Sequence, residues 1–314
     1  MNWWEVSHSA SRVDMVQRVE TVDNLLVSFR RDLRSQQRSA RTISMYLYAV
    51  NQFLLHLDIP ASEATVDVFT RENLKDWVYE SSEKWMPNTI NTHFTGVSRF
   101  AKWLVDEDYL EDDPSKRIPL PVEKDTAPEV LSDEELAALL KGCSGKDFQA
   151  RRDTAILRVL LDTGVRVSEL VSMTLEGTDL DEEKTVITGK GGKVRIIYFS
   201  SRTVSALDRY VRVRSSHKYA KVGELWLTQR GKMTTNGVRT MLVKLGNRSG
   251  VTGLHPHRFR HTWAHDHLLN DTSTVDLKRL AGWSSEKMLS RYGASGADVR
   301  AEQAARRQAR GDRV

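Results

Sequence analysis

The sequence has one cysteine and few prolines among its 314 residues, and both scarcities limit what kind of protein it can be. A lone Cys143 excludes an internal disulfide and any zinc site built from four cysteines. No run of about 18 uncharged apolar residues occurs, so the sequence predicts no membrane-spanning helix. The first residues, Met1 to Glu5, lack the basic-then-apolar order of a secretory signal. We therefore expect a soluble, intracellular protein.

Charge is nearly balanced, with a modest basic excess. Lys and Arg number 47 against 42 Asp and Glu, which gives a net charge of +5 and a pI near 9.2. Such an excess favours binding to a polyanion such as a nucleic acid, although a solvated surface produces the same balance. With 39% hydrophobic residues the chain can bury a sizeable core, and its length favours two domains.

The first third of the sequence is helical in pattern. Apolar residues recur every three or four positions in four segments between Glu20 and about Val105, and the second segment stops before Pro60. Thr70 and Asn88 are suited to cap the third and fourth helices. Four amphipathic helices of this length predict a small bundle. Its second and fourth helices carry basic residues that are candidates for phosphate contacts, or else a solvated face: Arg41, Arg99 and Lys102.

Four of the seven prolines fall within residues 111–129, a segment that has neither helical nor strand periodicity. Proline fixes its own backbone and restricts the residue before it. The segment is therefore predicted to be an extended linker between two domains.

The second half of the sequence combines helical patterns with one pair of β-rich segments. Ser132 and Glu135 have the capping-box spacing at a helix start, and a further helix, from about residue 152 to 162, ends at Gly164. Residues 185–188 and 194–199 flank glycines and predict a β-hairpin. Turns are predicted at four further glycines: Gly231, Gly246, Gly250 and Gly282. The expected fold class is mainly α with a small β-hairpin (α+β), in two domains.

Several polar residues of this half stand where local structure does not require them. Taken singly, each has an ordinary explanation, since a lysine between glycines is usually an exposed turn residue. Together they form five motifs in a fixed order: Arg166-Val-Ser-Glu169, Gly189-Lys-Gly191, His257-x-x-Arg260, Gly282-Trp283 and Tyr292. These motifs resemble those of the tyrosine recombinases, which include phage integrases and Xer-type recombinases. The resemblance extends over about residues 20–295.

The resemblance implies a role for each matching residue. In chain order it implies a phosphate-clamping arginine, a hairpin lysine, a histidine, a second clamping arginine, a tryptophan and a tyrosine nucleophile: Arg166, Lys190, His257, Arg260, Trp283 and Tyr292. Many members have a second histidine in place of Trp283, whose indole keeps a hydrogen-bond donor but has no acid–base function. Glu169 is expected to orient Arg166, and His261 to support the site from the same helical face as His257.

The chemistry of phosphodiester cleavage calls for these residue types. Attack adds negative charge to the non-bridging oxygens, which guanidiniums stabilise with paired donors. A phenol has a pKa of about 10 and needs a base or nearby cations, so His257 is the expected proton acceptor. Lys190 is the expected proton donor to the departing 5′-oxygen. Because guanidiniums neutralise the phosphate and the phosphotyrosine retains the bond's energy, no metal and no cofactor are expected.

The resemblance also implies an architecture and partners. The expected segments are an N-terminal extension, a helical SAM-like DNA-binding domain, a linker, a catalytic domain and a tail that docks on a neighbouring subunit or is merely solvated: 1–19, 20–110, 111–129, 130–295 and 296–314. The two domains would clamp double-stranded DNA. A homotetramer on two DNA sites would exchange strands through 3′-phosphotyrosine links and a Holliday junction. Excision or accessory factors are possible further partners, and no binding to a membrane is expected. The expected location is the cytoplasm, at the nucleoid of a bacterium or host cell.

Alternatives remain open at the level of sequence. His261 and His265 have the i, i+4 spacing of zinc ligands but lack the glutamate of His-Glu-x-x-His, so a metal-dependent nuclease is one rival. A DNA-binding protein that keeps the fold without the chemistry is another. Because only about 20 residues precede the first helix, no additional arm-binding domain is expected. We favour an integrase of a phage or mobile element, with an Xer-like resolvase of chromosome or plasmid dimers as the alternative.

Overall fold

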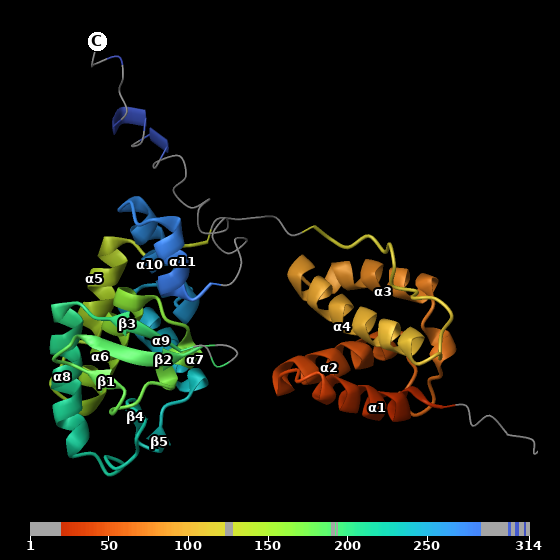
Figure 1. The fold of residues 1–314 in the computed structure, drawn as a ribbon, viewed down its shortest axis with the longest axis horizontal. Coiled ribbons are helices and arrows are strands. Elements are labelled where there is room, and N and C mark those ends of the chain that lie inside the picture. Colours follow the sequence, from red (N-terminus) through yellow and green to blue (C-terminus); the bar gives the residue numbers. More distant parts are fainter. Residues whose placement is uncertain are drawn as a thin grey trace, which may run out of the picture. The chain divides into compact units, whose positions relative to one another are not determined.

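The computed structural model describes residues 20–122, 128–189, 192, 194–283, 301–302, 305–307 and 311. The chain divides into two compact units, Met1–Lys124 and Asp125–Val314, which run from red to yellow and from yellow-green to blue in Figure 1. Among the described helices, none has the length and apolar character needed to cross a membrane.

The first unit is a bundle of four helices, as its apolar periodicity predicts (Figure 1). Its elements are α1 (Val22–Ser35), α2 (Ala40–His56), the 3-10 helix η1 (Val66–Val68), α3 (Arg71–Lys84) and α4 (Pro87–Asp106). The side chains of Ser39 and Thr70 accept backbone hydrogen bonds that cap α2 and α3. Phe29, Phe53 and Phe100, from three different helices, are at most 1% exposed and lie at the centre of the core.

The prediction that Asn88 caps the fourth helix is wrong. α4 begins one residue earlier, at Pro87, and Met86 takes the extended conformation of the cap residue. Proline suits the first helical position because its φ is already helical and an N–H there would have no partner within the helix. Asn88 lies inside the first turn, where its carbonyl accepts a hydrogen bond from the hydroxyl of Thr92.

Part of the proline-rich segment 111–129 packs on the first unit. Ile118 is 8% exposed and belongs to the core of the bundle. The hydroxyl of Ser115 hydrogen-bonds to a serine of α4 at 2.7 Å, and Asn91 of α4 donates to the carbonyl of Pro121 at 3.2 Å. The extended chain thus follows the bundle at least as far as Pro121.

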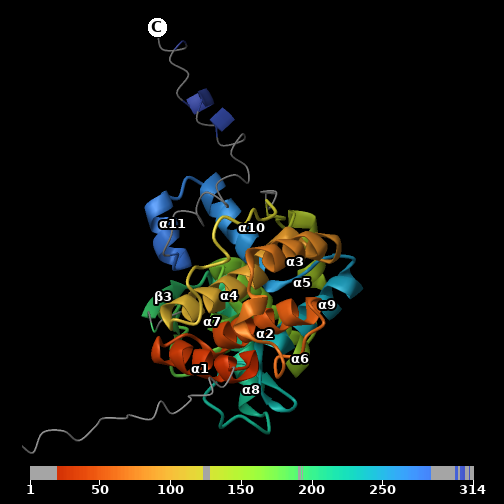
Figure 2. The ribbon, with the colours of Figure 1, turned by 90° about the vertical axis from the view of Figure 1, so that its right-hand side faces the viewer.

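The second unit is mainly helical and contains two small antiparallel sheets, which confirms the expected fold class. Its helices are α5 (Asp133–Gly142), α6 (Phe148–Thr163), α7 (Val167–Val171), α8 (Ser201–Ser215), α9 (Thr235–Ser249), α10 (Pro256–Leu269) and α11 (Thr274–Ala281). Helix α6 packs on both α8 and α10, and its Ile156, Leu157 and Leu160 are fully buried. In both views of the molecule α10 and α11 lie side by side (Figures 1 and 2).

The predicted hairpin is present as the last two strands of a three-stranded sheet. β1 (Thr178–Asp179), β2 (Lys184–Thr188) and β3 (Val194–Tyr198) pair in sequence order, with Thr188 opposite Val194 next to the hairpin loop. A second, two-stranded sheet joins β4 (Leu227–Thr228) to β5 (Gly231–Lys232). Most residues of this unit's core come from its helices and not from these sheets.

Three glycines end helices in the left-handed conformation that side chains disfavour. Gly164, Gly250 and Gly282 have φ values of 54°, 73° and 62° and terminate α6, α9 and α11. Each of them could be read from the sequence as a stop signal. The first and the third also place residues of the site described below.

The turn predicted at Gly246 is wrong, because this glycine lies inside α9. A Cβ at Gly246 would lie 2.5 Å from the carbonyl oxygen of Val251 and 3.1 Å from the Cβ of Leu254. The chain after α9 folds back here, and the Val251 N–H donates to the Gly246 carbonyl at 2.9 Å. The glycine is needed for close packing, not for a turn.

Alanine at two glycines of α9 should therefore have opposite effects. Gly246→Ala should lower the free energy of unfolding by about 1–3 kcal/mol, because the new methyl group overlaps the Val251 carbonyl. Gly237→Ala is the matched control, since its nearest neighbours lie at 3.5 Å, and it should raise the free energy of unfolding by up to about 1 kcal/mol through helix propensity. Urea unfolding of both variants checks this, and equal stability would contradict the packing explanation.

Candidate active site

The motif Arg166-Val-Ser-Glu169 is shaped by the end of one helix and the start of another. Gly164 ends α6, and Arg166 then takes the extended conformation of the residue that precedes α7. The Arg166 backbone N–H donates to Oε2 of Glu169 at 2.8 Å, which is half of a capping box. Local helix-capping rules thus bring the arginine and the glutamate together at the start of α7.

The carboxylate of Glu169 is shared by two guanidiniums. Arg166 Nη1 donates to Oε1 at 3.0 Å, while Arg195 of β3 donates from Nη1 and Nη2 to both carboxylate oxygens at 2.8 and 2.9 Å. The Glu169 side chain is only 2% exposed. Burial by itself would raise the pKa of Glu169, but the hydrogen bonds and charges of Arg195 and Arg166 outweigh it and hold that pKa below its usual value.

Three arginines converge on the last turn of α11. Three successive carbonyl oxygens each accept a hydrogen bond from a different guanidinium: Leu280 from Arg195 Nε at 3.2 Å, Ala281 from Arg260 Nη2 at 2.7 Å, and Gly282 from Arg166 Nη2 at 3.3 Å. The end of a helix carries partial negative charge and unpaired carbonyls, so it is a natural acceptor for cations. Arg166 and Arg260, which belong to two of the predicted motifs, therefore meet at the predicted Gly282-Trp283 motif.

The three guanidiniums differ in their access to solvent. Arg260 is 2% exposed, and its Nη1 is also held by the carbonyl of Gly164 at 2.6 Å. The Arg195 side chain is 16% exposed, and that of Arg166 is 33% exposed. Arg166 is thus the most accessible of the three to an incoming phosphate.

His257 lies at the start of α10, in the turn that contains Arg260. Pro256 occupies the first helical position, as the sequence predicts, and His257 follows it at the positively polarised end of the helix. The residue as a whole is exposed, yet partial burial of its imidazole and then the charge of Arg260 lower the pKa of His257. The ring is therefore neutral near pH 7. The rings of His257 and His261 are 6.3 Å apart between centroids, so both lie on one face of α10.

Trp283 directly follows Gly282 and is 5% exposed. Its ring packs in a cluster with Trp263, Leu268 and Leu277 from α10 and α11. The guanidinium carbon of Arg260 lies 5.5 Å from the ring centroid, a cation–π distance. The tryptophan thus supports Arg260 from one side, while its predicted donation to a phosphate stays a prediction.

Two of the predicted catalytic residues, Lys190 and Tyr292, lie outside the described residues. In the sequence the described strands β2 and β3 lie on either side of Lys190, and the described Trp283 comes nine residues before Tyr292. Their roles stay predictions. Within the part of the chain that the structure describes, no three His, Cys, Asp or Glu side chains gather in a way that could hold a metal ion.

The comparisons with known proteins agree with this geometry. The model of the Phage integrase family matches residues 129–298, more than half of the chain. The chain belongs to this family, the tyrosine recombinases. A second model, described as the N-terminal SAM-like domain of phage integrases, matches residues 25–111. Tyrosine recombinases are enzymes that cleave and rejoin DNA.

Relatives with curated names are tyrosine recombinases as well. Tyrosine recombinase XerC of Bacillus pumilus is 31% identical over 256 residues, which cover 79% of this chain and 83% of that protein. XerC of Bacillus subtilis is 29% identical over 85% of this chain and 90% of its own length.

Solved structures show the same fold. The Tn1549 transposon integrase in complex with transposon right-end DNA has a TM-score of 0.70 at 18% identity, covering 92% of this chain and 100% of that one. A λ integrase dimer bound to a COC′ core site has a TM-score of 0.69 at 14% identity, covering 87% and 77%.

Sequence reasoning missed two arginines of this recombinase site. Arg195 sits on β3 with the same inward orientation as the buried Ile197, so a charged residue at an inward position of an alternating strand was the available signal. Arg239 of α9 is exposed and close enough for its charge to contribute to the lowered pKa of His257. No pattern near Arg239 marked it.

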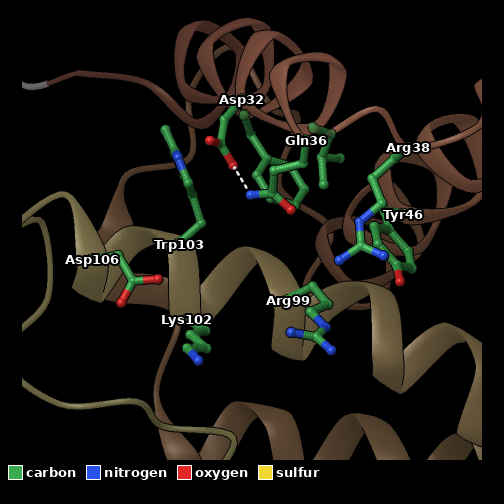
Figure 3. A pocket seen from close by; sticks show the side chains of 10 residues that line it. Asp32, Gln36, Arg38, Tyr46, Arg99, Lys102, Trp103 and Asp106 are labelled. Carbon is green, nitrogen blue, oxygen red and sulfur yellow. Dashed lines mark hydrogen bonds between the residues drawn. The ribbon is translucent and has the colours of Figure 1, made fainter.

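In the first unit, two of the three residues predicted to contact phosphates line the same pocket. Arg99 and Lys102 of α4 line a pocket of about 180 Å³ together with Arg38, as Figure 3 shows. Asp32 and Asp106 lie in the same pocket and partly offset its positive charge. Arg41 is exposed but is not among the residues that line it.

Arg38 also lines a second basic pocket. It is lined by Arg30 and Arg34 of α1 and by apolar residues of α2. Sequence reasoning missed these arginines, although Arg30 and Arg34 lie four residues apart on one side of α1; Arg38 lies in the loop between α1 and α2. The polar surface of the recombinase's first unit is therefore more basic than the three predicted residues suggest.

Loss of the Glu169 charge should cost stability at neutral pH but not in acid. A carboxylate whose pKa is lowered on folding stabilises the folded state above its unfolded pKa, and that contribution disappears as the pH falls through the folded pKa. Glu169→Gln should lower the free energy of unfolding at pH 7 by about 2–4 kcal/mol, because it leaves Arg195 without its buried partner. Urea unfolding between pH 7 and 3 measures the difference, which should shrink as the pH falls below the usual glutamate range.

Glu182→Gln is the control for this measurement. The Glu182 side chain is 68% exposed and pairs with Lys184 at the surface, so its loss should change the free energy of unfolding by less than about 0.5 kcal/mol at any pH. A constant difference between wild type and Glu169→Gln across the pH range would show that the carboxylate charge is not the cause.

Proposed function

We propose that this chain is a site-specific DNA recombinase in which Tyr292 attacks the scissile phosphate. The observation that supports it best is the convergence of Arg166 and Arg260 on one helix end, ten residues before Tyr292 in the sequence. Two guanidiniums held by protein acceptors form a preorganised site for a phosphate whose charge rises during attack.

In the proposed reaction the phenol oxygen of Tyr292 forms a bond to phosphorus while the bond to the 5′-oxygen breaks. His257, neutral near pH 7, accepts the phenol proton, and Lys190 gives a proton to the departing 5′-oxygen. Arg166 and Arg260 bind the non-bridging oxygens. The 3′-phosphotyrosine link retains the energy of the phosphodiester, so the 5′-hydroxyl of a partner strand can attack it without ATP. Nothing in this sequence of steps calls for a metal ion or a cofactor.

The protein binds double-stranded DNA through basic surfaces on each unit. In the first unit these are the two pockets that share Arg38, with Arg99 and Lys102 in one and Arg30 and Arg34 in the other. In the second unit it is the arginine cluster around α11. The structural neighbours include integrases in complex with DNA. Phosphate contacts of this kind make binding strongly dependent on salt.

An Xer-like exchange between two identical sites is the biological role that the curated relatives favour, since those named above are XerC recombinases. Integration by a phage or mobile element is the second candidate, and structural neighbours of that kind share the fold. Deletion between two identical sites on one plasmid tests the Xer-like role. In either role a homotetramer on two duplexes would carry out the exchange, and the mass of the complex in solution tests that stoichiometry.

A docking role for the tail, residues 296–314, is part of the same proposal. The segment is described only at residues 301–302, 305–307 and 311. There, Arg307 pairs with Asp271 of its own chain. The other residues of the tail lie outside the described residues, and docking of the tail on a neighbouring subunit stays a prediction.

The pH dependence of cleavage should report His257. Because its pKa is lowered, the ring stays neutral down to a pH below the usual histidine range, and the cleavage rate should fall only once the pH drops below that range. His257→Ala should cleave more slowly, by about 100-fold, and lose this acid limb. Single-turnover cleavage between pH 5 and 8 measures both. An unchanged acid limb in the variant would assign it to another group.

Formation of a covalent adduct tests the proposed function directly. The protein would be incubated in EDTA with nicked DNA that carries its recombination site, taken from the DNA that flanks its gene. We expect a protein–DNA adduct on a denaturing gel with the wild type and none with Tyr292→Phe, because the phenol is the nucleophile.

Each other outcome assigns a different function. Tight site-specific binding without an adduct would favour a DNA-binding protein that keeps only the fold. Cleavage without an adduct that occurs only when EDTA is left out would favour metal chemistry at His261 and His265, and an adduct with the phenylalanine variant would mean another nucleophile.

A further inference from the structure

Arg195 occupies a place in the site that no motif of the sequence assigned to it. It projects from β3, the strand after the hairpin loop, and binds two separate elements at once: Glu169 at the start of α7 and the Leu280 carbonyl at the end of α11. The approach to α11 is close. A Cβ at Gly282 would lie 2.9 Å from Arg195 Nη1, so a side chain at this position would displace the guanidinium.

The two arginines that bind Glu169 make different numbers of hydrogen bonds to it. Arg195 uses Nη1 and Nη2 to engage both carboxylate oxygens, whereas the Arg166 side chain makes one hydrogen bond to Oε1. One carboxylate with one bidentate guanidinium is a neutral pair. The positive charge of Arg166 is then not balanced by this carboxylate. The Arg166 side chain is also more exposed than that of Arg195, at 33% against 16%.

We propose that Arg195 is a positioning residue for strand cleavage: by engaging both oxygens of Glu169, it keeps the Arg166 guanidinium and its charge available to the scissile phosphate. The inference rests on the proposed function, since it assumes that Arg166 binds that phosphate. Arg195 itself does not touch the DNA in this assignment.

Removal of Arg195 would change Arg166 through the glutamate. The buried carboxylate would be left with one cation, and a carboxylate 2% exposed to solvent cannot turn to water for a second partner. Arg166 would close on it as a bidentate pair and give up its hydrogen bond to Gly282. The phosphate would then meet the neutral pair of Arg166 and Glu169 instead of a positively charged Arg166.

The same reasoning separates arginine from lysine at this position. Arg195 uses Nε for Leu280 and its two terminal nitrogens for Glu169, an arrangement that only a planar guanidinium provides. A single ammonium would neutralise the carboxylate but could not hold both oxygens and the end of α11. Arg195→Lys should therefore retain part of the function that Arg195→Met loses.

The test compares cleavage rates of three variants on the nicked DNA used to trap the covalent adduct. Arg195→Met should form the adduct about 10- to 100-fold more slowly than the wild type, and Arg195→Lys should lie between them. The double variant Arg195→Met/Glu169→Gln should be faster than Arg195→Met by about 10-fold, since without the carboxylate charge nothing neutralises Arg166. A role in folding alone predicts the opposite, because the second substitution removes a further buried contact.

A neutral linkage provides a second readout. When a methylphosphonate replaces the scissile phosphodiester, less negative charge develops and the clamp matters less, so wild type and Arg195→Met should differ by less than about 3-fold. Arg212→Met is the matched control. It removes an arginine that is 73% exposed and pairs with Asp208 at the surface, and it should cleave both substrates at the wild-type rate.

The outcomes separate this inference from the function on which it depends. A wild type that forms no adduct overturns the proposed function and the inference with it. A wild type that forms the adduct at the rate of Arg195→Met overturns the inference alone. So does a double variant slower than Arg195→Met, which would place Arg195 in direct contact with the phosphate or in the fold only.

Discussion

The buried carboxylate of Glu169 is the interaction on which the rest of the site depends. Burying one negative charge is costly unless strong donors surround it, and here two guanidiniums and one backbone N–H do so. Each of those guanidiniums also reaches a carbonyl at the end of α11. A single anion therefore fixes the start of α7, the strand after the hairpin loop and the last turn of α11 relative to one another. Mispositioning any one of these elements would leave a charge unpaired in the interior.

Local signals predicted the elements, and long-range packing accounts for most of what they missed. Periodic apolar residues and glycines that end helices depend only on neighbours in sequence, so the bundle, the hairpin and the helix end at Gly164 were all predictable. Asn88 was misassigned because proline one residue earlier is a better start. Gly246 resembles a turn residue until the chain that packs on it is known. Arg195 lies 26 residues from Glu169, and no local pattern reveals such a partner.

The motif order named residues that the structure brings together, Arg166, Arg260 and Trp283, but not how their surroundings differ. From sequence the two clamping arginines look equivalent. In the structure Arg260 is enclosed, with carbonyl oxygens on both terminal nitrogens and the ring of Trp283 beside it, whereas Arg166 keeps a third of its side chain in solvent. In the proposed reaction the first is a fixed reference for the phosphate, and the second can adjust as DNA arrives. Burial and hydrogen-bond partners carry this distinction, and neither can be read from residue type.

In the proposed reaction, the end of α11 holds these arginines in place, so that they need no reorganisation before a phosphate binds. In water a guanidinium is solvated by molecules that must reorient when charge develops, and that reorientation is part of the barrier. Here three successive peptide carbonyls, fixed by the helix itself, take the place of that water. Their partial negative charge holds the cations together against mutual repulsion without neutralising them, because a helix end carries only about half a charge. In the proposed complex, a phosphate that binds beside them supplies further negative charge. The cluster is then stable without DNA but keeps a net positive charge that DNA would offset.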